Sequence, residues 1–368
     1  MTNDYPYASI KETSLLGRYV NYQKIKPVID KIGVSHNVET LGHSVLEIPI
    51  HGITLGKGKT KILMWSQMHG NESTTTKAVF DLIQALVQSG GTSEALLNKC
   101  TIKIIPMLNP DGARAYTRVN ANNIDLNRDA QDLSQPESQI LRKTYLDFKP
   151  DFCFNLHDQR SIFSAGHCPF PATLSFLAPA ADKDRHISKS RAISMKLIAA
   201  VNHFIQTLIP DQVGRYDDVF NRNCVGDTFQ MLNTPTVLFE AGHFQEDYDR
   251  EQTRKFLFLA LWEALKVITL DNLDAKTEED YFSIPENQKC YFDVIIKNAH
   301  KISASFEQGA SIGILFKEVL VGDRVEFIPH IEKSGALNTY FGHRIFDCEQ
   351  PKDLGLLKKQ QELIALLN

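Results

Sequence analysis

The stretch from Met64 to Glu72 holds the residues best suited to metal chemistry. An apolar run ends there in His69 and Glu72, which are three residues apart. Zinc takes imidazole nitrogen and carboxylate oxygen as ligands, and a catalytic zinc site needs three protein ligands and one open position. The same His-x-x-Glu spacing also occurs at two other places, His36/Glu39 and His243/Glu246. Spacing alone therefore does not identify a metal site. The predicted secondary structure around each pair must show which of the three pairs can form one.

Polar residues of complementary types follow other predicted strands. His157 comes directly after the apolar segment 151–156, and Glu240 comes after the segment 236–239. Arg118 and the pair Asn127-Arg128 lie between these two strands in sequence. Because active sites of open α/β sheets form at the carboxyl ends of strands, we expect these side chains to share one crevice with His69 and Glu72. His157 would supply the third ligand, and Glu240 would be a carboxylate free to accept a proton.

Alternation of strands and helices over the first 270 residues predicts an α/β fold, with a mixed, mostly parallel sheet covered by helices on both faces. Strands are expected at 44–50, 61–68, 101–107, 151–156 and 236–239, and helices at 15–32, 74–87, 136–148, 186–208 and 251–268.

The pattern changes after an acidic segment, 271–280, which reads as a linker. Short alternating segments then predict a small β-rich unit, with strands at 291–296, 311–316, 324–329 and 341–346 and a last helix at 351–367. We therefore expect a catalytic domain over residues 1–272 and a β-rich C-terminal domain over residues 281–368.

Bulk composition narrows the class of protein. The 368 residues are 43% hydrophobic and 23% charged, which is typical of a soluble globular chain. A formal net charge of −4 favours neither nucleic acid nor an anionic membrane as partner. The first residues lack the pattern of a signal peptide, and the six cysteines are dispersed as in a reduced protein. A cytoplasmic location is expected, and the oligomeric state stays open.

The motifs taken together resemble the zinc carboxypeptidase family. They cover roughly residues 60 to 245 in the order of that family: His-Gly-Asn-Glu (69–72), Asn-Pro-Asp-Gly (109–112), Arg118, Asp-Leu-Asn-Arg (125–128), His157 and Glu240. Taken by itself, Asn-Pro-Asp-Gly predicts a β-turn. Each motif is short, and the specificity lies in their joint occurrence.

The resemblance implies a role for each matching residue. One zinc ion per chain would be held by His69, Glu72 and His157. Arg118 would polarise the scissile carbonyl, with Arg114 as the alternative arginine. Asn127 and Arg128 would bind the C-terminal carboxylate of the substrate, although Arg128 could instead pair with Asp125 or Asp129. Glu240 would be the general base that takes a proton from water. Tyr216 is a looser candidate for the tyrosine that covers the substrate, and Asp227 for the specificity pocket.

Two departures keep other activities open. Glu240 is followed by Ala-Gly-His, whereas the digestive carboxypeptidases commonly have an arginine shortly after this glutamate. Glu-x-Gly and His-Gly-Asn-Glu also resemble the aspartoacylase and succinylglutamate desuccinylase enzymes and the murein peptide amidases. The expected function is hydrolysis of a peptide or small amide beside a free carboxylate. The alternatives are an N-acyl amino acid amidohydrolase, a cytoplasmic murein peptide amidase, or an inactive zinc- or peptide-binding module.

Overall fold

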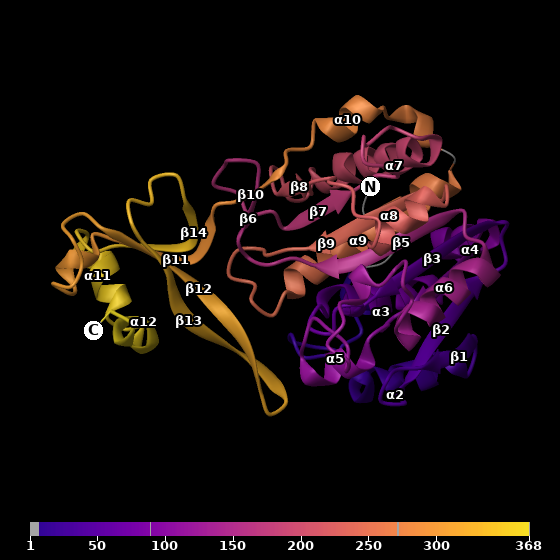
Figure 1. Cartoon of the computed structure of the whole chain (residues 1–368), viewed down its shortest axis with the longest axis horizontal. Helices are drawn as coiled ribbons and strands as arrows, with labels where there is room; N and C mark the ends of the chain where they lie inside the picture. The colour runs from indigo at the N-terminus through magenta and orange to yellow at the C-terminus, as the bar shows by residue number, and fades with distance from the viewer. Residues whose placement is uncertain (1–6, 89, 271, 368) are drawn as a thin grey trace.

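An eight-stranded mixed sheet forms the centre of the chain in the computed structural model, which describes residues 7–88, 90–270 and 272–367 (Figure 1). The strand order is β1-β2-β4-β3-β5-β9-β7-β8. The strands are β1 (Asn37–His43), β2 (Pro49–Gly56), β3 (Thr60–Ser66), β4 (Cys100–Ile105), β5 (Phe152–Asp158), β7 (Leu174–Leu177), β8 (Val213–Arg215) and β9 (Thr236–Ala241). Strands β4, β3, β5 and β9 run parallel in the middle of the sheet. The predicted α/β class is confirmed.

Helices cover both faces of this sheet, as its buried strands require. The larger helices are α2 (Tyr22–Gly33), α3 (Thr74–Leu86), α4 (Gly91–Lys99), α6 (Pro136–Phe148), α7 (Lys189–Ile205), α8 (Val225–Met231) and α9 (Glu251–Thr269). Alternate residues of β3 enter two different cores, because side chains of a strand point to opposite faces. Ile62 and Met64 pack with α3, α7 and α9, whereas Leu63 and Trp65 pack with α6 and α8.

A second, four-stranded sheet follows, in the order β13-β12-β11-β14. Its strands are β11 (Tyr291–Lys297), β12 (Ser311–Val321), β13 (Arg324–Gly335) and β14 (Phe341–Asp347). It packs on α11 (Pro351–Leu357) and α12 (Gln361–Ala365) around a hydrophobic cluster of its own. The short strands β6 (Phe163–Ala165) and β10 (Asn287–Lys289) pair with each other between the two sheets. The predicted β-rich unit is present, and the exact domain boundaries stay a prediction.

Several of the expected elements are wrong in their bounds. The strands expected at 311–316 and 324–329 extend to Val321 and Gly335. Most of the strand expected at 44–50 is a turn that leads into β2 at Pro49, because Glu47 adopts a left-handed conformation (φ 59°) and Ser44 closes the turn. The helix expected from residue 15 begins only at Tyr22, where the Asn21 side chain accepts a hydrogen bond from Lys24 N. The single helix expected at 351–367 is two short helices, α11 and α12.

The motif Asn-Pro-Asp-Gly does not form the β-turn that its composition predicts. It opens a short helix, α5 (Pro110–Ala115), in which Asn109 is the N-cap and its Oδ1 accepts from Gly112 N at 2.9 Å. Proline at the first helical position suits this start, since its missing N–H would have no partner there. The motif is therefore a helix-capping device.

The remaining short elements are α1 (Tyr7–Ile10), α10 (Glu278–Phe282) and the 3-10 turns η1 (Leu126–Arg128), η2 (Leu273–Ala275) and η3 (Ala299–Lys301). Elements η2 and α10 occupy the expected linker 271–280, of which residue 271 lies outside the described part. No helix within the described ranges is long and apolar enough to cross a bilayer.

Candidate functional site

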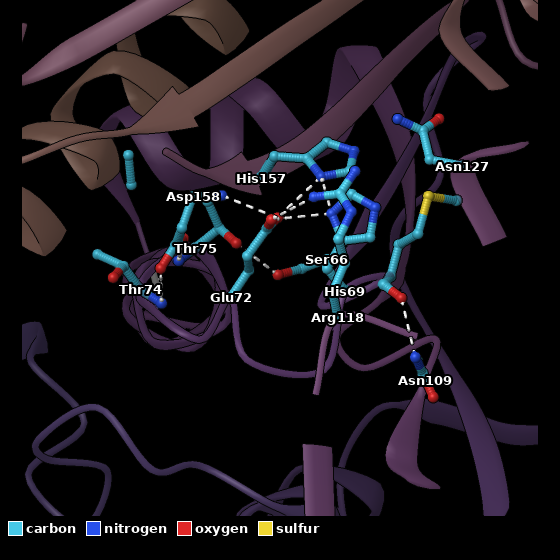
Figure 2. Close-up of polar contacts among 12 residues, drawn as sticks. Ser66, His69, Glu72, Thr74, Thr75, Asn109, Arg118, Asn127, His157 and Asp158 are labelled. Atoms are coloured by element: carbon cyan, nitrogen blue, oxygen red, sulfur yellow. Dashed lines mark hydrogen bonds and ion pairs between the residues drawn. The ribbon is translucent and has the colours of Figure 1, made fainter. Parts of the chain in front are cut away.

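His69, Glu72 and His157 converge at the carboxyl edge of the central sheet (Figure 2). His69 follows β3, Glu72 precedes α3, and His157 is the penultimate residue of β5. The two Nδ1 atoms of the histidines are 3.0 Å apart. Glu72 Oε1 is 2.8 Å from His69 Nδ1, and its Oε2 is 2.9 Å from His157 Nδ1. All three side chains are buried.

Asp125 fixes the tautomer of His69. Its Oδ1 lies 3.1 Å from His69 Nε2, whereas Glu72 and His157 lie near Nδ1 of the same ring. A proton on Nε2 that is donated to Asp125 leaves a lone pair on Nδ1, and a carboxylate in this place also orients a metal-binding ring. The residue type alone did not mark Asp125 for this role, although it lies two residues before Asn127 in the motif Asp-Leu-Asn-Arg.

The three converging groups have strongly perturbed acidities. Burial acts to raise the pKa of Glu72, but the two imidazoles outweigh it and hold that pKa well below its usual value. Burial lowers the pKa of His157, and the Glu72 carboxylate only partly offsets this. For His69, burial is outweighed by Glu72 and Asp125, so that its pKa is raised. Two imidazole nitrogens and two carboxylate oxygens within about 3 Å form a donor set that suits a divalent cation.

Glu240 lies beside this cluster on the neighbouring strand. It pairs with His157 in the register of β5 and β9, which places both side chains at the same height of the sheet. Its Oε2 is buried without a hydrogen-bond partner among the described residues. Burial, followed by the nearby carboxylates of Glu72 and Asp158, raises the pKa of Glu240 well above its usual value. Such a carboxylate is suited to hold and release a proton.

Asp158 ties the cluster to the start of α3. Its Oδ2 and Oδ1 accept hydrogen bonds from Thr74 N and Thr75 N at 2.9 and 3.2 Å. Its own backbone N–H donates to Glu72 Oε2 at 3.1 Å. A carboxylate at a helix N-terminus is stabilised by the helix dipole and by unpaired backbone donors. Asp158 is therefore a buried residue that positions Glu72 relative to the start of α3.

Arg118 is the arginine that lies beside the cluster. Its Nε donates to Asp125 Oδ2 at 3.1 Å, and its NH1 lies 3.4 Å from Glu72 Oε1. About half of its side chain (48%) is exposed toward the cleft, so its guanidinium is open to a ligand. Arg114, the alternative, is exposed and is not among the residues that line the cleft.

Asn127 and Arg128 lie on the opposite side of the cluster from Asp158, as Figure 2 shows for Asn127. Both belong to the 3-10 turn η1, whose N-cap is Asp125. Asn127 Oδ1 accepts from Val225 N at 3.0 Å, which ties the turn to the start of α8. Within the described residues, no ion pair joins Arg128 to Asp125 or Asp129, and its NH1 bonds Asn127 O and Cys224 Sγ.

All of these groups open into one cleft of about 840 Å³. Tyr216, which follows β8, lines it, and its ring packs at a tilt against the ring of Phe163, with 5.4 Å between the ring centroids. Burial and the carboxylate of Glu240 raise the pKa of Tyr216. Asp227, in the first turn of α8, also lines the cleft, and burial raises its pKa to about 7. The cleft thus brings together every predicted site residue.

The other two His-x-x-Glu pairs do not form sites. Glu39 is exposed and forms an ion pair with Lys103. His243 is buried between the two sheets, where its ring packs on His343 at 4.2 Å and on Tyr248 at 4.6 Å, while Glu246 is exposed. Its position at the carboxyl end of a central strand thus distinguishes the pair His69/Glu72 from the two other His-x-x-Glu pairs.

The fold and the site together define an α/β protein with a buried His-Glu-His cluster at the carboxyl edge of its sheet. Residues 28–153 match the sequence model of the zinc carboxypeptidase family. The predicted resemblance to that family is therefore confirmed, in sequence over this segment and in fold over most of the chain.

Curated relatives share only a segment with this chain. A protein named probable carboxypeptidase 2, from Arthroderma benhamiae, is 30% identical over 108 residues, which are 29% of this chain and 20% of that protein. A protein named gamma-D-glutamyl-L-diamino acid endopeptidase 1, from Lysinibacillus sphaericus, is 35% identical over 80 residues, or 20% of each chain. The matched segment spans about a fifth of the length of these relatives.

Solved structures share the fold at low identity. A metallo-carboxypeptidase from Burkholderia cenocepacia superposes with a TM-score of 0.56 at 17% identity, over 69% of this chain and 70% of its own. Carboxypeptidase A from Helicoverpa armigera gives 0.53 at 16% identity, over 74% of this chain and 77% of its own.

Proposed function

We propose that this protein is a zinc-dependent hydrolase that cleaves a peptide or amide bond beside a free carboxylate. The observation that carries the proposal is the shared cleft of about 840 Å³, which contains the His69–Glu72–His157 cluster, an unpartnered Glu240 carboxylate and exposed arginines. Each of these groups has a use in amide hydrolysis, and the family match supports the assignment.

The residues present fit the zinc that the family implies. Two buried imidazoles turn their Nδ1 atoms toward the same carboxylate, and Asp125 leaves a lone pair on one of them. His69, Glu72 and His157 would hold the ion. Zinc bound there would act as a Lewis acid, lowering the pKa of water to about 7 and polarising a carbonyl group.

Glu240 would act as the general base. Its free Oε2 would take a proton from the attacking water and later deliver it to the leaving amine. The guanidinium of Arg118 would stabilise the negative charge that develops on the carbonyl oxygen, because it lies next to the cluster and is open to the cleft.

Asn127 and Arg128 would hold the free carboxylate of the substrate. The planar guanidinium of Arg128 can bind a carboxylate through two parallel hydrogen bonds, and no carboxylate of the described chain occupies it. Tyr216 would cover the bound substrate from the β8 side of the cleft.

A second candidate is an amidase for small substrates, of the deacylase or muropeptide type. Residues of the second sheet line the cleft together with the catalytic groups, which limits the space for a long peptide. The name of the Lysinibacillus sphaericus relative, an endopeptidase for gamma-D-glutamyl-L-diamino acid bonds, also favours it.

One assay separates these candidates. Purified, zinc-loaded protein is incubated with peptides ending in a free carboxylate, with N-acyl amino acids, and with muropeptides, each with and without 1,10-phenanthroline. We expect hydrolysis that the chelator abolishes and that added zinc restores. If no substrate is turned over in a chelator-sensitive way, both enzymatic candidates are wrong and an inactive binding module remains.

A further inference from the structure

We infer that strand β12 of the second sheet closes the acyl side of the cleft, so that this protein accepts only substrates with one or two residues before the scissile bond. The inference rests on the proposed function for the direction in which the substrate lies. Residues of the second sheet line one side of the cleft and form a wall there, although they are far in sequence from His69, Glu72 and His157. These wall residues are Asp293, Leu315, Phe316, Lys317, Glu318 and His330.

The wall stands on the side where the acyl part of a substrate must run. Asn127 and Asp158 lie on opposite sides of the metal cluster (Figure 2). If Asn127 and Arg128 hold the free carboxylate, the chain before the scissile bond points toward Asp158. Asp158, Glu318, Arg18 and Arg250 all line the cleft, and against the lowering effect of burial the carboxylates of Asp158 and Glu318 both act to raise the pKa values of Arg18 and Arg250.

The side chain of Glu318 holds β12 in place through contacts with residues of the N-terminal part of the chain. Both of its oxygens lie 3.0 Å from NH2 of Arg18, and it also accepts a hydrogen bond from the hydroxyl of Tyr116. The Arg18 side chain is only 4% exposed, so loss of Glu318 would leave a buried cation unpaired. The backbone carbonyl of Arg18 in turn accepts from Ser73, the residue that begins α3 beside Glu72. The wall is thus tied to the same loop that carries a metal ligand.

Phe316 and Lys317 form the part of the wall that faces the cleft. Phe316 is held from several sides: its N–H donates to Asp293 Oδ2 at 2.7 Å, and its ring packs on Tyr248 at 5.2 Å. Lys317 is exposed and lines the same cleft. Phe316 makes this part of the wall rigid, because a packed ring cannot turn aside without losing its contacts.

The size of the cleft agrees with such a barrier. Its volume of about 840 Å³ lies within the range of roughly 300–1,000 Å³ that is usual for small-molecule pockets. An extended peptide needs about 3.3 Å of length for each residue, so every added residue must find a path past the wall. Long peptides therefore lose affinity, whereas short ones fit inside.

The test measures binding and does not depend on turnover. Zinc-loaded Glu240→Gln protein is equilibrated with acetylated peptide libraries of two, three, four and six randomised residues that end in a free carboxylate. Bound peptides are quantified by mass spectrometry. We expect the libraries of two and three residues to bind at least 10-fold better than the library of six. Equal binding of all lengths, or no binding of the short libraries, would overturn the inference.

Variants of two wall residues test whether the wall itself causes the dependence of binding on peptide length. In the same Glu240→Gln background, Phe316→Ala and Lys317→Ala should raise binding of the six-residue library about 10-fold and change that of the two-residue library less than 2-fold. Val321→Ala, an exposed residue of the same strand outside the cleft, is the matched control and should leave the ratio unchanged. An equal shift for all lengths in the Phe316 variant would contradict the wall. Length-limited binding without any turnover would refute the proposed function and leave the wall intact.

Discussion

Glu240 is the residue on which the proposed chemistry depends most directly. It is close to His157 in register but has no hydrogen-bond partner for Oε2, so its substitution removes a proton acceptor without removing a ligand. We expect Glu240→Gln to keep about one zinc per chain while turnover falls roughly 10²- to 10⁴-fold. Metal analysis together with steady-state kinetics would check this. Glu246→Gln, an exposed glutamate six residues away, is the control. Full turnover in the Glu240 variant would remove it as the base.

Arg128 offers a separate prediction, because its proposed contact is made only by substrates with a free carboxylate. We expect Arg128→Ala to lower kcat/KM for such substrates about 10- to 100-fold, the usual effect of losing a hydrogen bond to a charged group. Substrates with an amidated end should change less than about threefold. Arg114→Ala, exposed and outside the cleft, is the matched control. Equal losses on both kinds of substrate would contradict the carboxylate contact.

Asp227 predicts a pH dependence of stability. Burial raises the pKa of this carboxyl from 3.8 to about 7 in the folded protein. An unfolded chain loses the proton near pH 4 and the folded chain near pH 7, so folding stability falls between these values and stays lower above them. Asp227→Asn cannot ionise and avoids this loss. We expect the variant to gain on the order of 1–4 kcal/mol relative to wild type between pH 5 and pH 8.

Urea unfolding of both proteins at pH 5 and pH 8 measures that difference. The neutral forms of the two side chains are similar in size and hydrogen bonding, so the comparison at pH 5 is the internal reference. A free-energy difference between variant and wild type that is the same at both pH values would show that Asp227 titrates at its ordinary pKa.

At the scale of elements, the loop between β3 and α3 and the start of α5 hold each other in place. Asn109 donates from Nδ2 to Met68 O at 3.1 Å, directly before His69 (Figure 2). Gly70 approaches the backbone of α5 so closely that a Cβ atom there would lie 1.9 Å from Gly112 C. Backbone atoms cannot move aside at low energetic cost. The loop between β3 and α3 therefore needs a residue without a Cβ atom at position 70 in order to pack against α5.

Gly70→Ala should therefore disturb the site although it removes no ligand. We expect a loss of stability of at least about 1–3 kcal/mol, as for other overpacked sites, together with weaker zinc binding. Gly355→Ala in α11 is the matched control, because a Cβ atom there meets nothing within 4 Å. That variant should be as stable as wild type or slightly more so. Thermal unfolding and zinc titration of both variants would check the pair. Unchanged zinc affinity in Gly70→Ala would contradict the packing argument.

Sequence patterns were most successful where a single periodicity dominates an element. The helix at 136–148 was predicted with its observed bounds, because a proline begins it and an apolar stripe runs along it. The turn between β1 and β2 was missed because it depends on one left-handed residue, Glu47, which is not a residue type that signals such a turn. Asn-Pro-Asp-Gly was misassigned since its residues suit both a turn and a capped helix start.

Across the whole molecule, the convergence of His69, Glu72 and His157 could be predicted from the sequence, but the surroundings of this cluster could not. His69, Glu72, His157 and Glu240 lie at or just after the carboxyl ends of strands, so a general rule for α/β sheets brings them together. The contact between Arg18 and Glu318 joins residues 300 positions apart, and no local pattern marks either of them. Only such long-range contacts of Glu318 with Arg18 and Tyr116 place β12 at the border of the cleft.

Removal of metal should lower the stability of the whole chain, because the proposed ligands join the loop between β3 and α3 to the central strand β5. An ion that binds only the folded state stabilises it by about 2.7 kcal/mol when present at a hundred times its Kd. We therefore expect 1,10-phenanthroline to lower Tm of the zinc-loaded protein by several degrees, and added zinc to restore it. Glu72→Gln removes a ligand and should lose this response.

Asp182→Asn is the matched control for that experiment. Asp182, Asp184 and His186 form a second group of side chains that are close enough to share an ion, but this group is mostly exposed. Water already satisfies exposed carboxylates, so their ion binding contributes little to folding. We expect the chelator response of Asp182→Asn to equal that of wild type. If Asp182→Asn lost the response and Glu72→Gln kept it, the stabilising ion would have to bind at Asp182, Asp184 and His186. The ligands proposed at the central sheet would then be wrong.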